Sequence, residues 1–127
     1  MTDYTAPLRD MRFILHDVFQ GPALWARLPE LAERIDAHTA DAILEEAAKV
    51  TAQLIAPLSR NGDEQGVHFD AGTVTTPDGF RDAWRTYREG GWVGLGGNPE
   101  YGGMGMPKML GVLFEEMLYA CLLYTSD

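Results

Sequence analysis

The sequence predicts an all-α fold that contains at most one small β-hairpin, near residues 67–75. Apolar residues recur at the spacing of a helix face in several separate segments. The composition, 46% apolar and 23% charged, is that of a globular chain, and 127 residues suit one domain. Nine of the 14 glycines fall between residues 90 and 111, which predicts an irregular loop between two helical parts.

The first predicted helix covers residues 8–19. Pro7 suits its first turn, and we expect Gly21 and Pro22 to end it because both residue types interrupt helices. Its predicted buried stripe consists of Leu8, Met11, Ile14, Leu15 and Val18. A second, shorter helical stretch, interrupted by Pro29, contains the apolar residues Trp25, Leu28, Leu31 and Ile35.

The longest periodic segment runs from about Thr39 to Ala56. Thr39 is the predicted N-cap, because its hydroxyl can accept a hydrogen bond from a backbone N–H that lacks a helical partner. Pro57 and the segment 59–62 should end or kink this helix. Its predicted buried face steps by three or four residues and consists of Ile43, Ala47, Val50, Leu54 and Leu58.

A small hairpin and a further helix are predicted next. Residues 67–69 and 73–75 are candidates for two short strands, and residues 70–72 form a three-residue connection with glycine last. Thr76 should cap the helix that follows, with Pro77 at its first position. The predicted buried stripe of that helix consists of Phe80, Ala83, Trp84 and Tyr87.

Gly90 and Gly91 should end that helix, and Pro107 should open the last one. The last helix is apolar nearly all round, so we expect it to be buried on most sides. In 127 residues few partners can surround it, so we expect part of its apolar surface to stay exposed and to drive self-association. The residues that carry this surface are Leu110, Leu113, Phe114, Met117, Leu118, Leu122, Leu123 and Tyr124.

The charge of the chain excludes several classes of function. Ten basic and 19 acidic side chains give a net charge of −9, which argues against nucleic-acid and anionic-membrane binding, because both need clustered Lys and Arg. The single cysteine, Cys121, excludes a disulfide framework and a Cys-based zinc site. No signal peptide and no apolar run of roughly 20 residues is visible, so we expect a soluble cytoplasmic protein with no membrane span.

None of the catalytic or ligand-binding patterns is complete. The glycine-rich segment follows no predicted parallel strand and matches neither G-x-G-x-x-G nor a P-loop ending at Lys108. We interpret its glycines as allowing the chain to cross tightly over a helix surface. Glu115 and Glu116 point about 100° apart on a helix and do not face one site. Three histidines lie far apart in the sequence, which favours solvated or capping roles over a metal site: His16, His38 and His68.

Several strings of residues resemble one enzyme family. Residues 4–15 (YTAPLRDMRFIL), 56–63 (APLSRNGD) and 75–80 (TTPDGF) resemble the acyl-CoA dehydrogenase branch that contains the 3-methylmercaptopropionyl-CoA dehydrogenases. These matches are in order, correctly spaced and extend from residue 4 to about residue 120. The first-domain signature of the wider family is similar to three further strings, at residues 91–95 (GWVGL), 99–105 (PEYGGMG) and 115–117 (EEM).

The resemblance implies an amino-terminal helical extension over residues 1–35 and a truncated acyl-CoA dehydrogenase amino-terminal helical domain over residues 36–127. It also implies FAD as cofactor, an acyl-CoA substrate, an electron-transferring flavoprotein as redox partner, and a homo-oligomer. In members of the family, a glutamate of a later domain removes the α-proton, and FAD accepts a hydride from the β-carbon. The resemblance therefore assigns no catalytic and no cofactor-binding residue here, and we expect this chain to be inactive alone.

Four residues are candidates for shaping the substrate pocket or the glycine-rich loop: Trp92, Tyr101, Gly102 and Gly103. We expect Trp92 to anchor the loop on the helices rather than to meet substrate. Residues 121–127 depart from the family's pattern, and we interpret them as a truncated or read-through reading frame. The alternative reading of the whole chain is a self-contained helical interaction or ligand-binding module that lacks the chemistry.

Overall fold

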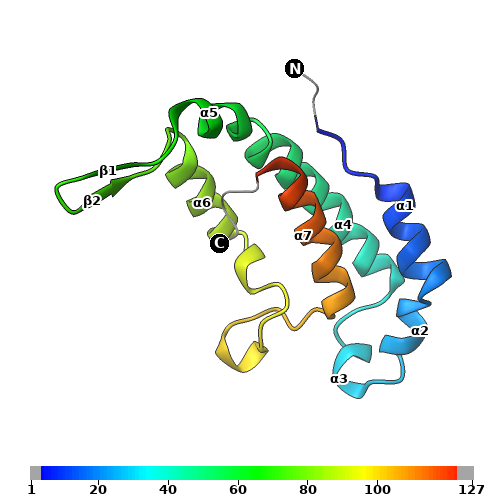
Figure 1. The fold of residues 1–127 in the computed structure, drawn as a ribbon. Helices are drawn as coiled ribbons and strands as arrows, with labels where there is room; N and C mark the ends of the chain where they lie inside the picture. Colours follow the sequence, from blue (N-terminus) through cyan, green and yellow to red (C-terminus); the bar gives the residue numbers. More distant parts are fainter. Residues whose placement is uncertain (1–3, 123–127) are drawn as a thin grey trace.

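The computed structural model describes residues 4–122 and is mainly helical (Figure 1). The predicted all-α fold with one small hairpin is confirmed, and no helix in residues 4–122 is long and apolar enough to cross a membrane. In chain order the elements are α1 (Leu8–Arg12), the π-helical turn η1 (Phe13–Val18), α2 (Gly21–Trp25), α3 (Pro29–Ala32), α4 (Ala37–Val50), the π-helical turn η2 (Thr51–Ile55), α5 (Leu58–Gln65), β1 (His68–Asp70), β2 (Thr73–Thr75), α6 (Phe80–Glu89), the 3₁₀ turns η3 (Trp92–Gly94) and η4 (Pro99–Tyr101), and α7 (Lys108–Cys121).

The core lies where α4 packs against both α1 and α7. Burying one large apolar side chain contributes about 1.5–3 kcal/mol, so this cluster holds the first 35 residues to the rest of the chain. The hairpin of β1 and β2 projects away from this body, next to α5 and α6 (Figure 1). The largest fully buried side chains are Trp25, Met11, Leu15, Leu44, Leu110, Met117 and Thr51.

The first helix changes its winding after one and a half turns. Beyond Arg12 it continues as a π-helical turn, in which the Phe19 N–H donates to the Ile14 carbonyl at 3.0 Å, five residues back. The wider turn rotates the following side chains, so Ile14 and Val18 are exposed while Leu15 is buried. The predicted burial of Ile14 and Val18 is therefore wrong.

The two short helices that follow agree in part with the prediction. The first helix ends before Gly21, where Gln20 is left-handed at φ 50°, but Gly21 and Pro22 then begin α2. Pro29 interrupts the stretch and opens α3, as predicted. Trp25 and Ile35 are buried, whereas Leu28, which lies between the two helices, is exposed and does not belong to the core.

The long helix α4 begins earlier than predicted, and its buried face overlaps the predicted one only at Ala47. Its N-cap is Asp36, whose carboxylate accepts from the Thr39 N–H at 2.7 Å, so the predicted Thr39 cap is wrong. The buried face consists of Ala40, Leu44, Ala47 and Thr51, and the larger Ile43 and Val50 are only partly buried beside it. Small alanines occupy the centre of this face because α1 and α7 both pack closely against the helix.

The middle of the chain kinks at Pro57 and continues as α5. Gly62 lies inside α5, where a Cβ would lie 2.7 Å from the Phe80 ring, so this glycine makes room for α6 instead of ending a helix. In the hairpin, Phe69 pairs with Val74 across the antiparallel strands. The connection has two residues, Ala71 and Gly72, instead of the predicted three, and both have the positive φ of a type I′ turn.

The helix α6 begins at Phe80 behind a left-handed Gly79, so the prediction of Thr76 as its cap is wrong. Its end at Gly90 and Gly91 is confirmed. Pro107 opens α7, as predicted. Tyr119 of this helix is exposed, although the sequence pattern did not identify it as part of an exposed apolar surface. The expected exposed surface of this helix is largely wrong: Leu110, Leu113, Phe114, Met117 and Leu122 are buried, Leu118 is partly buried, and Leu123 and Tyr124 lie outside the described residues.

Candidate functional site

The glycine-rich loop closes on itself through backbone hydrogen bonds. The Met104 N–H donates to the Gly94 carbonyl at 2.8 Å, and the Gly105 N–H donates to the Gly97 carbonyl at 2.9 Å. At Gly103 a Cβ would lie 2.2 Å from the carbonyl carbon and oxygen of Gly97, so the two chain segments touch. Because these N–H groups are already bonded, they cannot cradle a phosphate. The tight contact that the glycines allow is between two segments of the loop itself, whereas the interpretation expected it between the loop and a helix surface.

The four candidate residues of this loop do not converge on one pocket. The Trp92 ring packs on Phe114 of α7, with ring centres 4.9 Å apart, and is partly buried. Tyr101 is 88% exposed, and Gly102 occupies the left-handed position that ends η4. Gly103 contacts backbone only. The structure therefore places Trp92 between the loop and α7, where an anchoring side chain would lie.

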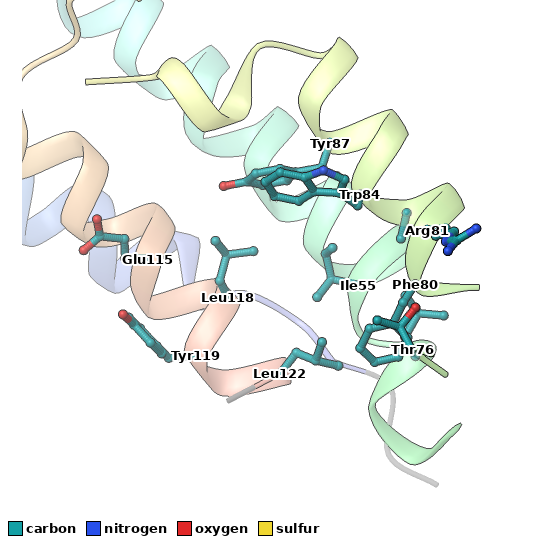
Figure 2. Close-up of a pocket in the computed structure, with 12 residues that line it drawn as sticks. Ile55, Thr76, Phe80, Arg81, Trp84, Tyr87, Glu115, Leu118, Tyr119 and Leu122 are labelled. Atoms are coloured by element: carbon teal, nitrogen blue, oxygen red, sulfur yellow. The ribbon is translucent and has the colours of Figure 1, made fainter. Parts of the chain in front are cut away.

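A groove of about 510 Å³ separates α6 from the second half of α7 (Figure 2). Figure 2 shows Leu118 of α7 facing Trp84 and Tyr87 of α6, with Ile55 of η2 between the two helices. A volume of this size lies within the 300–1,000 Å³ typical of small-molecule sites. The groove is lined by Ile55, Leu58, Thr76, Phe80, Arg81, Ala83, Trp84, Tyr87, Glu115, Leu118, Tyr119 and Leu122.

A row of aromatic rings connects this groove to the glycine-rich loop. Trp84 stacks on Tyr87 with ring centres 5.8 Å apart, and Tyr87 stacks on Phe114 at 6.0 Å. Phe114 also contacts Trp92, which forms the end of the row at the glycine-rich loop. The sequence pattern assigned Trp84 to the core, but it is 55% exposed and forms a wall of the groove. The sequence signal that could have indicated this wall is the spacing of Trp84 and Tyr87, two aromatic residues three positions apart on one helix.

The lining of the groove is mainly apolar, so the groove can bind an apolar group. Burial, and secondarily the Glu115 carboxylate, raises the pKa of Tyr87, so its phenol is protonated at neutral pH. The Glu115 side chain is half exposed, and the nearest cation to it is Lys108, at 4.0 Å. Arg81 is the only cation among the residues that line the groove. Glu116 does not line the groove, in agreement with the prediction that the two glutamates point apart.

A separate polar cluster connects the first helix to α4. His16 Nε2 lies 2.7 Å from Asp41 Oδ1, and the Arg12 guanidinium contacts both Asp41 and Glu45. His16 is therefore a partly buried residue that is hydrogen-bonded to Asp41, and the prediction of a solvated or capping role for it is wrong. Within residues 4–122 no three His, Cys, Asp or Glu side chains gather as a metal site, and His38 and His68 are exposed.

Comparison with known proteins identifies the family. Residues 37–126 match the family described as the acyl-CoA dehydrogenase N-terminal domain. The chain belongs to the acyl-CoA dehydrogenase family. It is 35% identical over 115 residues to the 3-methylmercaptopropionyl-CoA dehydrogenase of Ruegeria pomeroyi (strain ATCC 700808 / DSM 15171 / DSS-3). This alignment covers 91% of the present chain, which spans about a fifth of that relative's length (19%).

The resemblance to the acyl-CoA dehydrogenases and to this branch is thereby confirmed. In this acyl-CoA dehydrogenase domain, the glycine-rich loop, the aromatic row and the groove all lie within the matched residues 37–126. The first helix and its ion pairs to α4 begin before the matched range. The family match therefore includes the candidate site.

Proposed function

We propose that this chain forms the amino-terminal helical part of an FAD-dependent acyl-CoA dehydrogenase, which oxidises an acyl-CoA thioester between its α- and β-carbons. The observation that carries the proposal is the family match over residues 37–126, together with a 35% identical relative that is a 3-methylmercaptopropionyl-CoA dehydrogenase. FAD, held by other parts of the proposed enzyme, would supply the hydride acceptor, and an electron-transferring flavoprotein is the expected redox partner.

The described residues do not fit the binding of FAD itself. The N–H groups of Gly94, Leu95, Gly97 and residues 101–106 are bonded within the glycine-rich loop, and the residues that line the groove include one cation, Arg81, so neither offers a ready place for a pyrophosphate. We therefore assign FAD to other parts of the proposed enzyme and assign no step of the reaction to it here.

We assign to the groove the role of an apolar wall for the acyl part of the substrate. Its lining is aliphatic and aromatic, with Thr76 and Arg81 on one side and Glu115 on the other. Such a wall contributes binding energy and excludes water, at about 25 cal/mol per Å² of apolar surface buried. Glu115 is not the general base in this proposal, because it is half exposed and lies near Lys108. The chain alone is therefore expected to be inactive.

A chimeric enzyme tests the proposal. The aligned segment of the Ruegeria pomeroyi relative is replaced by this chain, and acyl-CoA-dependent bleaching of the bound flavin is measured. We expect bleaching in the chimera and none with the 127-residue chain alone. A chimera that folds and retains FAD, but whose flavin is not bleached by any acyl-CoA, would indicate the alternative, a helical module without the chemistry.

Two matched variants of the chimera test the groove. Trp84→Ala removes a wall of the groove, and we expect it to raise KM for longer acyl chains more than for short ones, because only longer chains reach the missing surface. Phe69→Ala, on the exposed hairpin, is the control and should change neither KM nor kcat. Equal effects of the two variants would remove the groove from the substrate site.

A further inference from the structure

A second pocket lies at the beginning of α7, where α2 and α3 adjoin that helix (Figure 1). Its volume of about 440 Å³ lies within the range typical of small-molecule sites. It shares no lining residue with the groove between α6 and α7, which reaches α7 only from Glu115 onwards. We call it the α7 pocket. Its lining consists of Leu24, Trp25, Arg27, Leu28, Leu31, Pro107, Lys108 and Met109.

Most of this lining is apolar, and part of it is fixed by the core. Trp25 and Pro107 are buried, so the floor of the pocket is held in place by the packing of the chain. Leu24 and Leu28 are exposed and Leu31 is partly buried. An apolar group in the pocket would therefore remove leucine surface from water, which favours its binding.

The indole N–H of Trp25 is a buried donor without an acceptor. Its Nε1 makes no hydrogen bond to any residue of the described range 4–122, although Trp25 is only 2% exposed. Buried polar groups in native proteins are nearly always bonded, because an unbonded one costs free energy. Ring carbon Cζ2, on the edge that carries Nε1, and the Met109 sulfur both lie 3.0 Å from the place that a Cβ on Gly21 would take. This edge therefore lies beside Met109, whose flexible side chain can turn aside for a ligand oxygen.

The first backbone N–H groups of α7 also lack acceptors. This helix has 14 residues, and no side chain caps its beginning at Pro107. The Lys108 and Met109 N–H groups donate to no acceptor in the part of the chain that the structure describes. The amino end of a helix carries partial positive charge and binds carboxylates and other anions. Because Lys108 and Met109 line the α7 pocket, these free donors lie at its wall.

The charged side chains that line the α7 pocket are both cations. Arg27 makes no ion pair within residues 4–122, and the nearest carboxylate to Lys108, that of Glu115, is 4.0 Å away. The described lining includes no aspartate or glutamate, although the chain has 19 acidic and only 10 basic side chains. The pocket is therefore a place where this acidic chain attracts an anion.

We propose that the α7 pocket binds a small monocarboxylate with an apolar body, an alkyl chain or a ring. Its carboxylate oxygens accept from the free N–H groups at the beginning of α7 and from the indole N–H of Trp25. Its apolar body lies on Leu24, Leu28 and Leu31. A carboxylate fits because it only accepts hydrogen bonds, whereas the unpaired polar groups of the pocket only donate them. The inference does not depend on the proposed function.

Proton–nitrogen NMR of the 127-residue chain tests the proposal, because each of the three tryptophans gives one indole N–H signal. The spectrum of Trp25→Phe identifies the signal of Trp25, and sodium octanoate below its micelle concentration is the probe. We expect a saturable shift of the Trp25 signal and of the backbone signals of Lys108 and Met109. The signal of Trp84, which lines the groove, should stay in place over the same range.

Two other probes separate the contributions of charge and apolar surface. Octan-1-ol has the same alkyl chain without the charge, and acetate has the charge without the chain. We expect each to bind at least about 10-fold more weakly than octanoate, because each loses one of the two kinds of contact.

A matched pair of variants tests the place of binding. Leu28→Glu puts a carboxylate into the α7 pocket at a position that is 53% exposed, and it should weaken octanoate binding at least about 10-fold. Val74→Glu, on the hairpin at a position that is 56% exposed, makes the same change of charge and should leave the affinity unchanged. Circular dichroism checks that both variants remain folded, because each replaced side chain lies at the surface.

Several outcomes would overturn the proposal. These are a Trp25 signal that does not move, octan-1-ol binding as tightly as octanoate, or unchanged octanoate affinity in Leu28→Glu. Equilibrium dialysis of labelled octanoate extends the test to the chimera described above, where Leu28→Glu should bind one equivalent less than Val74→Glu. Equal binding by these two chimeras would also overturn the proposal, because another part of the polypeptide would then cover the pocket. Flavin bleaching by acyl-CoA reports on the proposed function separately.

Discussion

The contact between Gly103 and Gly97 gives a sharp prediction for the stability of the glycine-rich loop. In a Gly103→Ala variant the new Cβ would lie 2.2 Å from the carbonyl atoms of Gly97, whereas ordinary contacts lie at about 3.5–4.0 Å. The obstacle is backbone, so no rotamer change relieves it. The two segments must therefore separate by more than about 1 Å.

Separating the segments removes the hydrogen bonds that close the loop. The bonds from Met104 to Gly94 and from Gly105 to Gly97 are each worth about 1 kcal/mol. With the strain of overpacking added, we expect Gly103→Ala to cost about 3 kcal/mol. Gly102→Ala is the matched control: its φ of 88° makes alanine strained, but no atom lies within 4 Å of the new Cβ. It should cost only about 1–2 kcal/mol.

Urea denaturation of the 127-residue chain, followed by circular dichroism, measures both variants under identical conditions. The expected order of falling stability is wild type, then Gly102→Ala, then Gly103→Ala. Thermal denaturation should give a midpoint about 10 °C lower for Gly103→Ala than for wild type, at roughly 3–4 °C per kcal/mol. Equal losses for the two variants, or a smaller loss for Gly103→Ala, would refute the close backbone contact and with it the account of the loop as a tight crossing.

Three further predictions concern other parts of the structure. Trp92→Ala should cost about 3 kcal/mol in urea denaturation by removing the packing on Phe114, and more than Trp84→Ala, whose ring is half exposed; the reverse order would contradict the anchoring role. Asp41→Asn should cost about 1 kcal/mol, because it weakens the polar contacts between the first helix and α4, and an unchanged urea midpoint would show that these contacts contribute nothing. The pKa of Tyr87 is raised above its usual 10.0 by burial and Glu115, so its contribution to stability is complete below pH 10 and is lost as the pH rises through the higher folded value. Tyr87→Phe should therefore lose less stability than wild type between about pH 9 and 12, and parallel losses would contradict the burial of the phenol.

Much of the fold could be predicted from local pattern because helix and turn signals act over a few residues. Proline at position 29, the glycine pair at 90 and 91, and proline at 107 mark element boundaries that the structure confirms. N-caps were less predictable. The side chain of Asp36, not of Thr39, accepts the capping hydrogen bond, because which of several nearby polar residues caps a helix depends on where the preceding loop places the first turn.

The candidate site could be predicted only in part. The sequence identified the glycine-rich loop and excluded a phosphate cradle, and the hydrogen bonds of Met104 and Gly105 show why. It did not identify the groove, because Ile55, Trp84 and Leu118 come from three elements that are about 30 residues apart along the chain. The aromatic row has the same origin, since Phe114 is neither near Tyr87 nor near Trp92 in the sequence.

The sequence by itself determined that the chain is helical, that one short hairpin interrupts the helices, and that a glycine-rich loop separates the helix ending at Gly90 from the helix opened by Pro107. It also carried the strings that resemble the acyl-CoA dehydrogenases. Only the tertiary structure decided which face of each helix is buried. Periodicity reports that a helix has an apolar side, but burial depends on which other segments approach it. For this reason Ala40 and Ala47 lie in the core between α1 and α7, whereas Phe13 and Phe19 remain on the surface.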